Sequence, residues 1–343
     1  MKFRVLTALL FTMSHILSAQ APPLKALPVP KIEQVATAPI SSIRGLSVVS
    51  DSVAWVSGTQ GKAGRTTDGG KTWQWFTVPG CDSVDFRDVE GFTGERAVLM
   101  GIASPARIFL TEDGGKNWEQ VYFNNDSAIF LDAMEFYGDR KGFIAGDPIN
   151  GNFKGLITPD GGKTWYNHPM PPADSGEACF AASGTTLRAL PGAQVAFASG
   201  GTHSRFYRLH GRKWQVTEWP ANQGQSSTGI FSFAFYNDKQ GVAVGGDYQK
   251  PEIVKGNCLL TTDGGASWTA PAAPPRGYRS AVEYIDKNLV ICTGPDGTDW
   301  SGDGGKTWQA LPGEGYHAVR RAKTGRTVYL AGARGRIAVV RGM

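Results

Sequence analysis

The chain has few of the residues from which most enzymes and metalloproteins build their sites. Its 343 residues include only four cysteines and five histidines. The cysteines lie far apart with no CxxC pair, and the histidines form no cluster, so no spacing typical of a metal site is present. GxSxG and HExxH motifs are missing, and the Gly-Gly-Lys-Thr sequences lack the upstream glycine of a phosphate-binding loop. We therefore expect no catalytic residues, no metal and no cofactor.

The four cysteines could form disulfides in an oxidising compartment. Their scatter over Cys81, Cys179, Cys258 and Cys292 favours buried free thiols instead. If one pair forms, Cys258 with Cys292 is the candidate, because both are expected on middle strands of adjacent repeats.

Apolar runs long enough to span a membrane and runs of lysine and arginine are missing as well. The apolar stretch 5–17 follows Lys2 and Arg4 and precedes a small-residue cleavage site, so residues 1–19 are predicted to be a secretory signal. The Pro-rich segment 20–30 is expected to be an extended leader. The net charge of +5, which falls to +3 without the two positive residues of the signal, does not indicate nucleic-acid binding. We expect an exported monomer, periplasmic or secreted, with no transmembrane segment.

Glycine is abundant, and much of it belongs to an eight-residue repeat, [Ser/Thr]-x-Asp-Gly-Gly-x-[Ser/Thr/Asn]-Trp. The aspartate can accept backbone N–H bonds across a tight turn, the glycines adopt angles that a Cβ disfavours, and the tryptophan anchors the next strand. This pattern resembles the Asp-box of β-propellers, and it predicts a hairpin wherever it occurs. We assign a structural role to its five aspartates, Asp68, Asp113, Asp160, Asp263 and Asp303.

Each repeat is predicted to form four short antiparallel strands. In the first repeat we expect strands at 42–46, 53–58, 64–66 and 73–76. The fourth repeat has lost the aspartate of the box but keeps the four-strand pattern. Its strands are expected at 179–182, 195–200, 205–209 and 214–216. A lost aspartate weakens one hairpin without removing the blade.

The last repeat has only three predicted strands, at 316–319, 328–332 and 336–340. The segment 31–35 resembles an outer strand of the second repeat and has no inner strands of its own, so we expect it to complete the last repeat. Closing the ring in this way removes an exposed sheet edge. The sequence thus predicts an all-β fold, a seven-bladed β-propeller formed by one domain, 31–343.

The start of each innermost strand supplies one position per blade around the central channel. Aligning the repeats gives, in order, Arg44, Arg87, Leu131, Phe180, Ser232, Arg279 and His317. Cations gathered at a channel mouth would suit an anionic partner, such as the carboxylate of a peptide. Long loops on the same face add four candidate contacts, His203, Arg205, Asp247 and Tyr248. The alternative is that each arginine pairs with a neighbouring acid, such as Asp88, Asp132 or Glu283, and only ties blades together.

With these features in place, the chain resembles the photosystem II stability/assembly factor family over residues 32–343. The resemblance rests on the Asp-boxes and on segments 43–49, 245–248 and 277–282. It implies a non-enzymatic assembly scaffold with an arginine patch for a protein partner, and the matching positions are Arg44, Arg87 and Arg279. Relatives are often labelled oxidoreductases, but no nucleotide, flavin or haem motif supports that label here.

Three hypotheses follow. The first is an exported binding or assembly propeller that docks an anionic peptide or protein segment. The second is a sialidase-type glycoside hydrolase, because sialidases combine Asp-boxes with three arginines that hold a carboxylate; the Arg-Ile-Pro signature and a convincing catalytic pair are absent from the sequence. The third is a purely structural extracellular interaction module.

Overall fold

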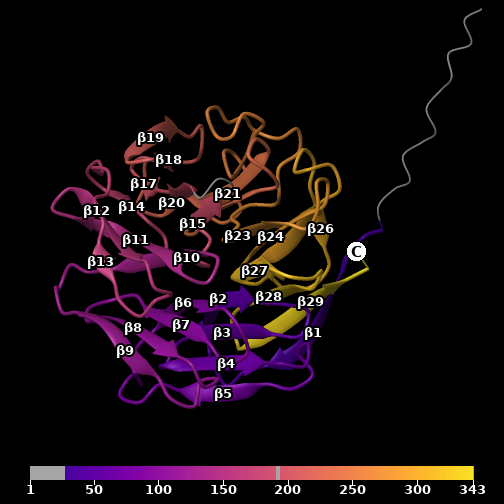
Figure 1. The fold of residues 1–343 in the computed structure, drawn as a ribbon. Coiled ribbons are helices and arrows are strands. Elements are labelled where there is room, and N and C mark those ends of the chain that lie inside the picture. Colours follow the sequence, from indigo (N-terminus) through magenta and orange to yellow (C-terminus); the bar gives the residue numbers. More distant parts are fainter. Residues whose placement is uncertain (1–27, 191–193, 343) are drawn as a thin grey trace, which may run out of the picture.

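Seven antiparallel sheets surround a central axis, like the blades of a propeller (Figure 1). The computed structural model describes residues 28–190 and 194–342. Within these ranges the chain forms strands, turns and irregular segments, and no helix is present that could cross a membrane. The predicted signal, 1–19, lies outside the described residues. The predicted all-β, seven-bladed propeller is confirmed.

Blades 1, 2, 3 and 6 each have four strands in sequence order from the axis outward. Their strands are, blade by blade, β2 (Ile43–Val48), β3 (Ala54–Gly58), β4 (Lys62–Thr66) and β5 (Gln74–Thr77); β6 (Phe86–Gly91), β7 (Ala97–Gly101), β8 (Ala106–Thr111) and β9 (Glu119–Asn124); β10 (Leu131–Tyr137), β11 (Lys141–Ile149), β12 (Asn152–Thr158) and β13 (Tyr166–Asn167); and β23 (Ala281–Tyr284), β24 (Val290–Gly294), β25 (Gly297–Ser301) and β26 (Gln309–Leu311).

Blade 7 joins the two ends of the described chain. It consists of β27 (Ala318–Arg321), β28 (Val328–Ala331) and β29 (Arg336–Arg341), and its outer strand is β1 (Lys31–Thr37). Strand β1 pairs antiparallel with β29 from Lys31 opposite Arg341 to Thr37 opposite Arg336. The predicted closure of the ring by the N-terminal segment is therefore confirmed.

Blade 4 departs from the prediction at its innermost strand. Its strands are β15 (Leu187–Leu190), β16 (Gln194–Ala198), β18 (Arg205–His210) and β19 (Lys213–Glu218). The segment 179–182, predicted to be the inner strand, forms no strand and is followed by further irregular chain up to 186. The prediction failed because this segment is apolar enough to resemble a strand, whereas its partners lie on other blades.

Blade 5 is extended on its inner side. It contains β20 (Thr228–Phe235), β21 (Gly241–Asp247) and β22 (Cys258–Thr261), and the short strands β17 (Gly200–Gly201) and β14 (Glu177–Ala178) continue the sheet beyond β20. At its outer edge only a bridge between Leu260 and Thr269 represents the fourth strand.

The five Asp-boxes adopt one hydrogen-bond pattern. In the first, the Thr72 hydroxyl and backbone N–H donate to the Asp68 carboxylate at 2.6 and 2.9 Å, and the Gly70 N–H donates to Thr66 Oγ1 at 2.9 Å. These bonds, first the one from the Thr72 hydroxyl, lower the pKa of Asp68 to about 2. Every one of them spans at most four residues, so the turn forms from local sequence.

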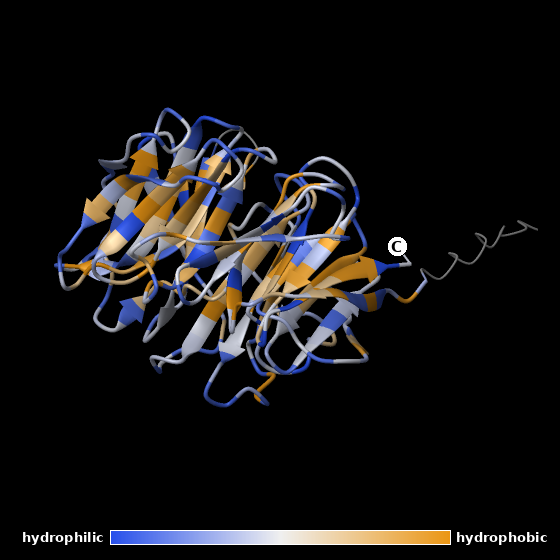
Figure 2. Ribbon diagram, turned by 90° about the horizontal axis from the view of Figure 1, so that it is seen from below, coloured by the Kyte–Doolittle hydropathy of each residue, from blue (hydrophilic) through white to orange (hydrophobic). Residues whose placement is uncertain are grey.

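Buried apolar side chains form clusters between neighbouring blades, and the hydrophobic colour lies mostly on the strands (Figure 2). One interblade cluster contains Trp55, Phe86 and Leu99, all fully buried, and others of the same kind occur around the ring. Cys258 and Cys292 are buried in a single cluster between blades 5 and 6, and all four cysteines are free. The blades are thus held together chiefly by apolar burial.

The centre of the ring is filled by residues 179–186, which we call the channel plug. Arg44 of blade 1 donates to the carbonyl oxygen of Ala182 at 3.0 Å. The Ser183 hydroxyl donates to the carbonyl oxygen of Ser280 in blade 6 at 2.8 Å, and the Thr185 hydroxyl donates to the side-chain hydroxyl of Ser232 in blade 5 at 2.6 Å. Contacts from one segment to blades on opposite sides place it across the axis.

Candidate functional site

Two arginines lie at the start of the inner strands because of a backbone irregularity. The register of β2 with β3 shifts between Ile43 and Gly45, and that of β6 with β7 shifts between Phe86 and Asp88. The skipped residues, Arg44 and Arg87, are bulges whose side chains leave the regular alternation of the strand. We call the face on which they lie, where the inner strands begin, the arginine face, and the opposite one the Asp-box face.

The guanidinium of Arg44 carries a positive charge without a carboxylate partner. Within the described ranges no acidic oxygen lies within 4.0 Å of it, and its bond to the Ala182 carbonyl leaves other N–H groups free to donate. Burial, then the nearby cation of Arg87, lowers the pKa of Arg44. Arg87 pairs with Asp85 at 2.8 Å, with about 30% of its own side chain exposed. The pair of arginines thus has an excess of positive charge.

His317 lies beside this pair. It is buried, and its Nδ1 is 3.1 Å from the carbonyl oxygen of Ile43 and 3.4 Å from the hydroxyl of Ser42. Burial, with the cation of Arg44 as the next cause, lowers the pKa of His317 to about 4. The imidazole is therefore neutral near pH 7, and it contributes a dipole rather than a charge.

Arg279, the third arginine of the predicted ring, is inside blade 6. Only 2% of its side chain is exposed, its Nε donates to Asp299 at 2.7 Å, and its Nη2 forms an ion pair with the same carboxylate. A further bond from Nη1 reaches the carbonyl oxygen of Tyr278 at 2.7 Å. The alternative considered from the sequence, in which an arginine pairs with a neighbouring acid and only stabilises the fold, therefore holds for Arg279. Its partner is Asp299 rather than one of the acids named there.

Two other ring positions were aligned one residue away from their true place. The register of β10 with β11 shifts between Leu131 and Ala133, and that of β20 with β21 between Ile230 and Ser232, so Asp132 and Phe231 are the bulged residues rather than Leu131 and Ser232. Phe180 belongs to the channel plug. A bulge changes the count of residues along a strand, and this is why alignment by strand alternation missed Asp132.

Asp132 is fully buried next to the arginine pair. Burial, then the neighbouring Asp147, raises the pKa of Asp132 well above its ordinary value, and the cation of Arg87 opposes this rise. The Asp132 carboxyl therefore takes up a proton at higher pH than an exposed aspartate, which limits how far it can neutralise the two guanidinium groups.

An aromatic shelf lies beside Arg44. It consists of Phe180, Phe231, Tyr248 and Tyr278. Phe180 stacks on Phe231 with ring centroids 3.9 Å apart, and the Tyr278 and Tyr248 rings meet Phe231 edge-on at 4.9 and 6.1 Å. The ring of Tyr248 is 47% exposed. The shelf offers an apolar surface next to a positive charge.

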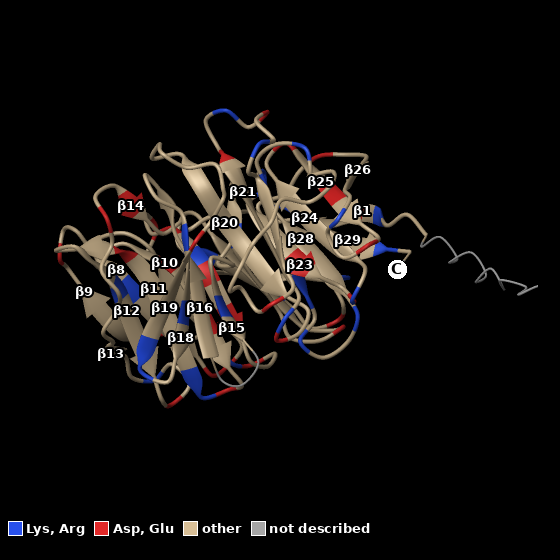
Figure 3. Ribbon diagram, turned by 90° about the horizontal axis from the view of Figure 1, so that it is seen from above, with Lys and Arg blue, Asp and Glu red and all other residues tan. Residues whose placement is uncertain are grey.

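The remaining predicted contacts belong to the rim. Arg205 is held by the buried Glu177, with Nε 3.1 Å from Oε1, and by Asp174 at 2.7 Å, while His203 is 3.8 Å from the same Asp174. Asp247 is buried and accepts the N–H of Gln249 at 2.9 Å. Figure 3 shows acidic residues on β14 and at the end of β21. Arg44, Arg87, His317 and the shelf that includes Tyr248 therefore form the candidate site, and Arg205 and His203 form a separate ion-paired cluster.

This chain is a seven-bladed β-propeller, and it is similar to photosystem II assembly factors of the same fold. The family model for photosynthesis system II assembly factor YCF48 matches residues 31–128. Photosystem II assembly protein Ycf48 of Synechococcus sp. (strain JA-2-3B'a(2-13)) is 24% identical over 300 residues, which cover 86% of this chain and 82% of that protein.

Solved structures agree on the architecture. YCF48 bound to D1 peptide matches with a TM-score of 0.66 and 19% identity, over 93% of this chain and 98% of that one. YCF48 from Cyanidioschyzon merolae matches with a TM-score of 0.65 and 18% identity, over 90% and 98%. The Pan2 WD40 domain of Neurospora crassa also matches, at 0.62 and 14%, over 90% and 94%. At these identities the likeness supports the propeller fold.

Proposed function

We propose that this protein is an exported, non-enzymatic assembly propeller that docks an anionic segment of a peptide or protein on its arginine face. The observation that carries the proposal is the half-buried guanidinium of Arg44, which has no carboxylate partner among the described residues and lies beside Arg87 and the aromatic shelf. A guanidinium in this state gains more from a carboxylate than an exposed one does, because less water competes for it.

The chemistry of the site suits the end of a peptide. A C-terminal carboxylate can accept two parallel hydrogen bonds from Arg44 or Arg87, and a neighbouring apolar side chain can pack on Phe231 and Tyr248. A structurally similar protein, YCF48, has been solved bound to D1 peptide, which supports a peptide as the kind of partner.

Binding can be tested with fluorescent hexapeptides that end in a free carboxylate, compared with the same peptides amidated at the C-terminus. We expect Arg44→Ala and Arg87→Ala to weaken binding of the free-acid peptides roughly 10- to 100-fold, since a charge-assisted hydrogen bond is worth about 1.5–3 kcal/mol. Arg326→Ala, which removes an exposed arginine on the Asp-box face, is the matched control. Equal affinities for wild type and Arg44→Ala would refute the proposal.

Recovery of partners from envelope extracts extends the test to natural ligands. The Arg44→Ala/Arg87→Ala variant should lose the partners that wild type retains, whereas Arg326→Ala should keep them. Export itself rests on residues 1–19, and fusing this segment to a reporter that is active only outside the cytoplasm tests it. A reporter that stays inactive would contradict the exported location.

The sialidase alternative loses its main support. It needs three arginines that converge on one carboxylate, and Arg279 is buried against Asp299, which leaves two at the channel mouth. Seven blades also exceed the six of that enzyme fold. Turnover of a fluorogenic sialoside by the purified protein would reverse this conclusion.

A further inference from the structure

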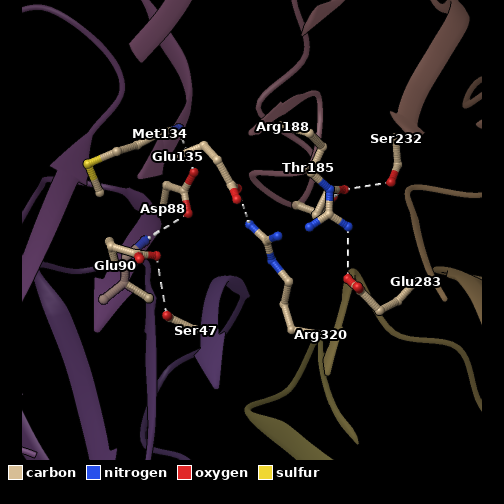
Figure 4. Close-up of polar contacts among 12 residues, drawn as sticks. Ser47, Asp88, Glu90, Met134, Glu135, Thr185, Arg188, Ser232, Glu283 and Arg320 are labelled. Atoms are coloured by element: carbon tan, nitrogen blue, oxygen red, sulfur yellow. Dashed lines mark hydrogen bonds and ion pairs between the residues drawn. The ribbon is translucent and has the colours of Figure 1, made fainter. Parts of the chain in front are cut away.

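The channel ends on the Asp-box face in a cavity of about 310 Å³. Six blades each contribute one polar side chain from the inner strand, namely Ser47, Glu90, Glu135, Arg188, Glu283 and Arg320. Figure 4 shows these side chains converging from separate blades. Ligand sites range from about 300 to 1,000 Å³, so the cavity suits a small molecule.

The channel plug separates this cavity from the arginine face. Asp88 precedes the lining residue Glu90 by two positions on β6, and Gly184 of the plug lies so close to Asp88 that an added Cβ would be 2.5 Å from its carboxylate oxygen. The bonds of the plug to blades 5 and 6 likewise reach residues that precede lining residues of those blades by three positions. The cavity and the arginine face are therefore separate sites.

The charged groups that line the cavity are paired with one another. There are three ion pairs, Arg188 with Glu283 at 2.8 Å, Arg320 with Glu135 at 3.3 Å, and Lys323 with Glu90. The remaining lining cation, Arg321, is exposed and donates to the carbonyl oxygen of Gly325 at 3.3 Å. Among the lining residues a cationic ligand finds no unpaired carboxylate, and an anionic one finds only Arg321 or must displace a carboxylate from its partner. The lining thus favours a ligand without a net charge.

The paired groups keep unused hydrogen-bonding capacity. The guanidinium of Arg320 has five N–H groups but forms one hydrogen bond within the described ranges, to Glu135 at 3.3 Å. Glu135 accepts no other bond there, and Glu283 accepts only the one from Arg188. The side chains of Arg320, Glu135 and Glu283 are only 13%, 20% and 17% exposed. Polar groups so far removed from bulk water are normally hydrogen-bonded, so the cavity offers both donors and acceptors to a ligand.

The wall formed by blades 5 and 6 is aromatic. Phe235, Tyr236 and Tyr284 line it, and the ring centroids of Tyr236 and Tyr284 are 6.0 Å apart. Tyr236 is 44% exposed. An accessible aromatic ring packs well against a flat group of C–H bonds. The cavity thus joins a polar interior, in which the charges are paired, to an apolar wall.

We propose that this cavity binds a neutral polyhydroxylated ring, the chemistry of a pyranose sugar. Each hydroxyl both donates and accepts, so a sugar can donate to Glu135 and Glu283 and accept from Arg320 while the ion pairs stay intact. The C–H face of the ring packs on Tyr236. The ligand is supplied either as a free monosaccharide or as the terminal sugar of a longer glycan, and both leave the arginine face open.

Saturation-transfer NMR and calorimetry on the intact protein test the proposal with the methyl pyranosides of glucose, galactose, mannose and N-acetylglucosamine. We expect at least one of these probes to bind. Tetrahydropyran-2-methanol, which has the same ring with a single hydroxyl, should give no signal. Affinity should be the same at about 50 and 500 mM NaCl, because salt does not screen the contacts of a neutral ligand as it screens those of a charged one.

Two variants locate the probe in the cavity. Tyr236→Ala should weaken binding of the preferred pyranoside roughly tenfold at an unchanged Tm, because the ring is half exposed and its loss leaves the core intact. Tyr166→Ala, which removes a 56% exposed tyrosine from the outer strand of blade 3, is the matched control and should bind like wild type. Glu135→Gln replaces a charged acceptor by a neutral one and should weaken binding roughly fivefold.

A longer probe distinguishes the two sources of the sugar. Tighter binding of the methyl monosaccharide than of the matching disaccharide supports a free sugar, and the reverse supports the end of a glycan. No binding of any pyranoside at millimolar concentration would overturn the proposal, as would equal binding by wild type and Tyr236→Ala. A methyl uronate that binds about tenfold tighter than its neutral parent would also overturn it, because the cavity would then be an anion site.

Discussion

Replacing Arg279 by alanine should destabilise the propeller rather than remove a binding contact. The change leaves the Asp299 carboxylate, 1% exposed, without its main partner. Breaking a buried ion pair by removing one member costs about 3–5 kcal/mol, because the other charge stays desolvated. Arg276 also contacts Asp299, at 3.1 Å, so we expect the lower end of this range.

Thermal unfolding measured by circular dichroism tests this magnitude. A chain of 343 residues has an unfolding entropy of about 0.7 kcal/mol/K, so a loss of 3–5 kcal/mol lowers the Tm by about 4–7 °C. Arg276→Ala is the matched control: it contacts the same carboxylate but is 59% exposed, and its removal should cost under about 1 kcal/mol. Arg279→Met combined with Asp299→Asn should recover part of the loss, since no buried charge then remains.

Peptide binding completes the test. Below its own Tm, Arg279→Ala should bind the free-acid peptides as wild type does. A variant with unchanged Tm and weakened peptide binding would refute the reasoning and return Arg279 to the binding site.

Three further outcomes are expected. The pKa of Asp88 is about 7 in the folded protein, above its unfolded value near 4. The contribution of Asp88 to stability is therefore present below pH 4 and is lost as the pH rises to 7. Urea unfolding of Asp88→Asn should show a smaller loss of stability between pH 5 and 8 than wild type. The pKa of His317 is about 4 in the folded protein, below its unfolded value near 6.5. The contribution of His317 to stability is therefore lost as the pH falls from 6.5 to 4. An NMR titration should show a neutral imidazole at pH 6. Gly162→Ala, at φ +88° with Val98 Cγ2 2.7 Å from the new Cβ, should lower the Tm more than Gly138→Ala, at φ +60° with open space around it; equal shifts would contradict the steric argument.

The repeats could be predicted from the sequence because their interactions are local. The Asp-box bonds join residues at most four apart, as between Asp68 and Thr72, so the motif specifies its turn wherever it occurs. The missing outer strand of the last repeat, together with the spare segment 31–35, was enough to predict the closure of the ring. The cationic residues Arg44 and Arg87 could also be placed at the channel mouth, since their strands follow the regular blade pattern up to the bulge.

Whether each candidate residue is buried or exposed, and paired or free, depended on partners far away in the chain. Ser183 of the channel plug binds residue 280, 97 positions later, and the apolar segment 179–182 before it was predicted to be a strand. Arg279, just before β23, and Asp299 of β25 meet in blade 6 although they lie 20 residues apart. Bulges place Asp132 and Phe231 where simple alternation places their neighbours. The sequence by itself determined the number of blades and how each turn forms, because those depend on short-range bonds. The tertiary structure alone decided which charges are paired and which are free, because pairing in a closed ring joins residues that only the complete ring brings together.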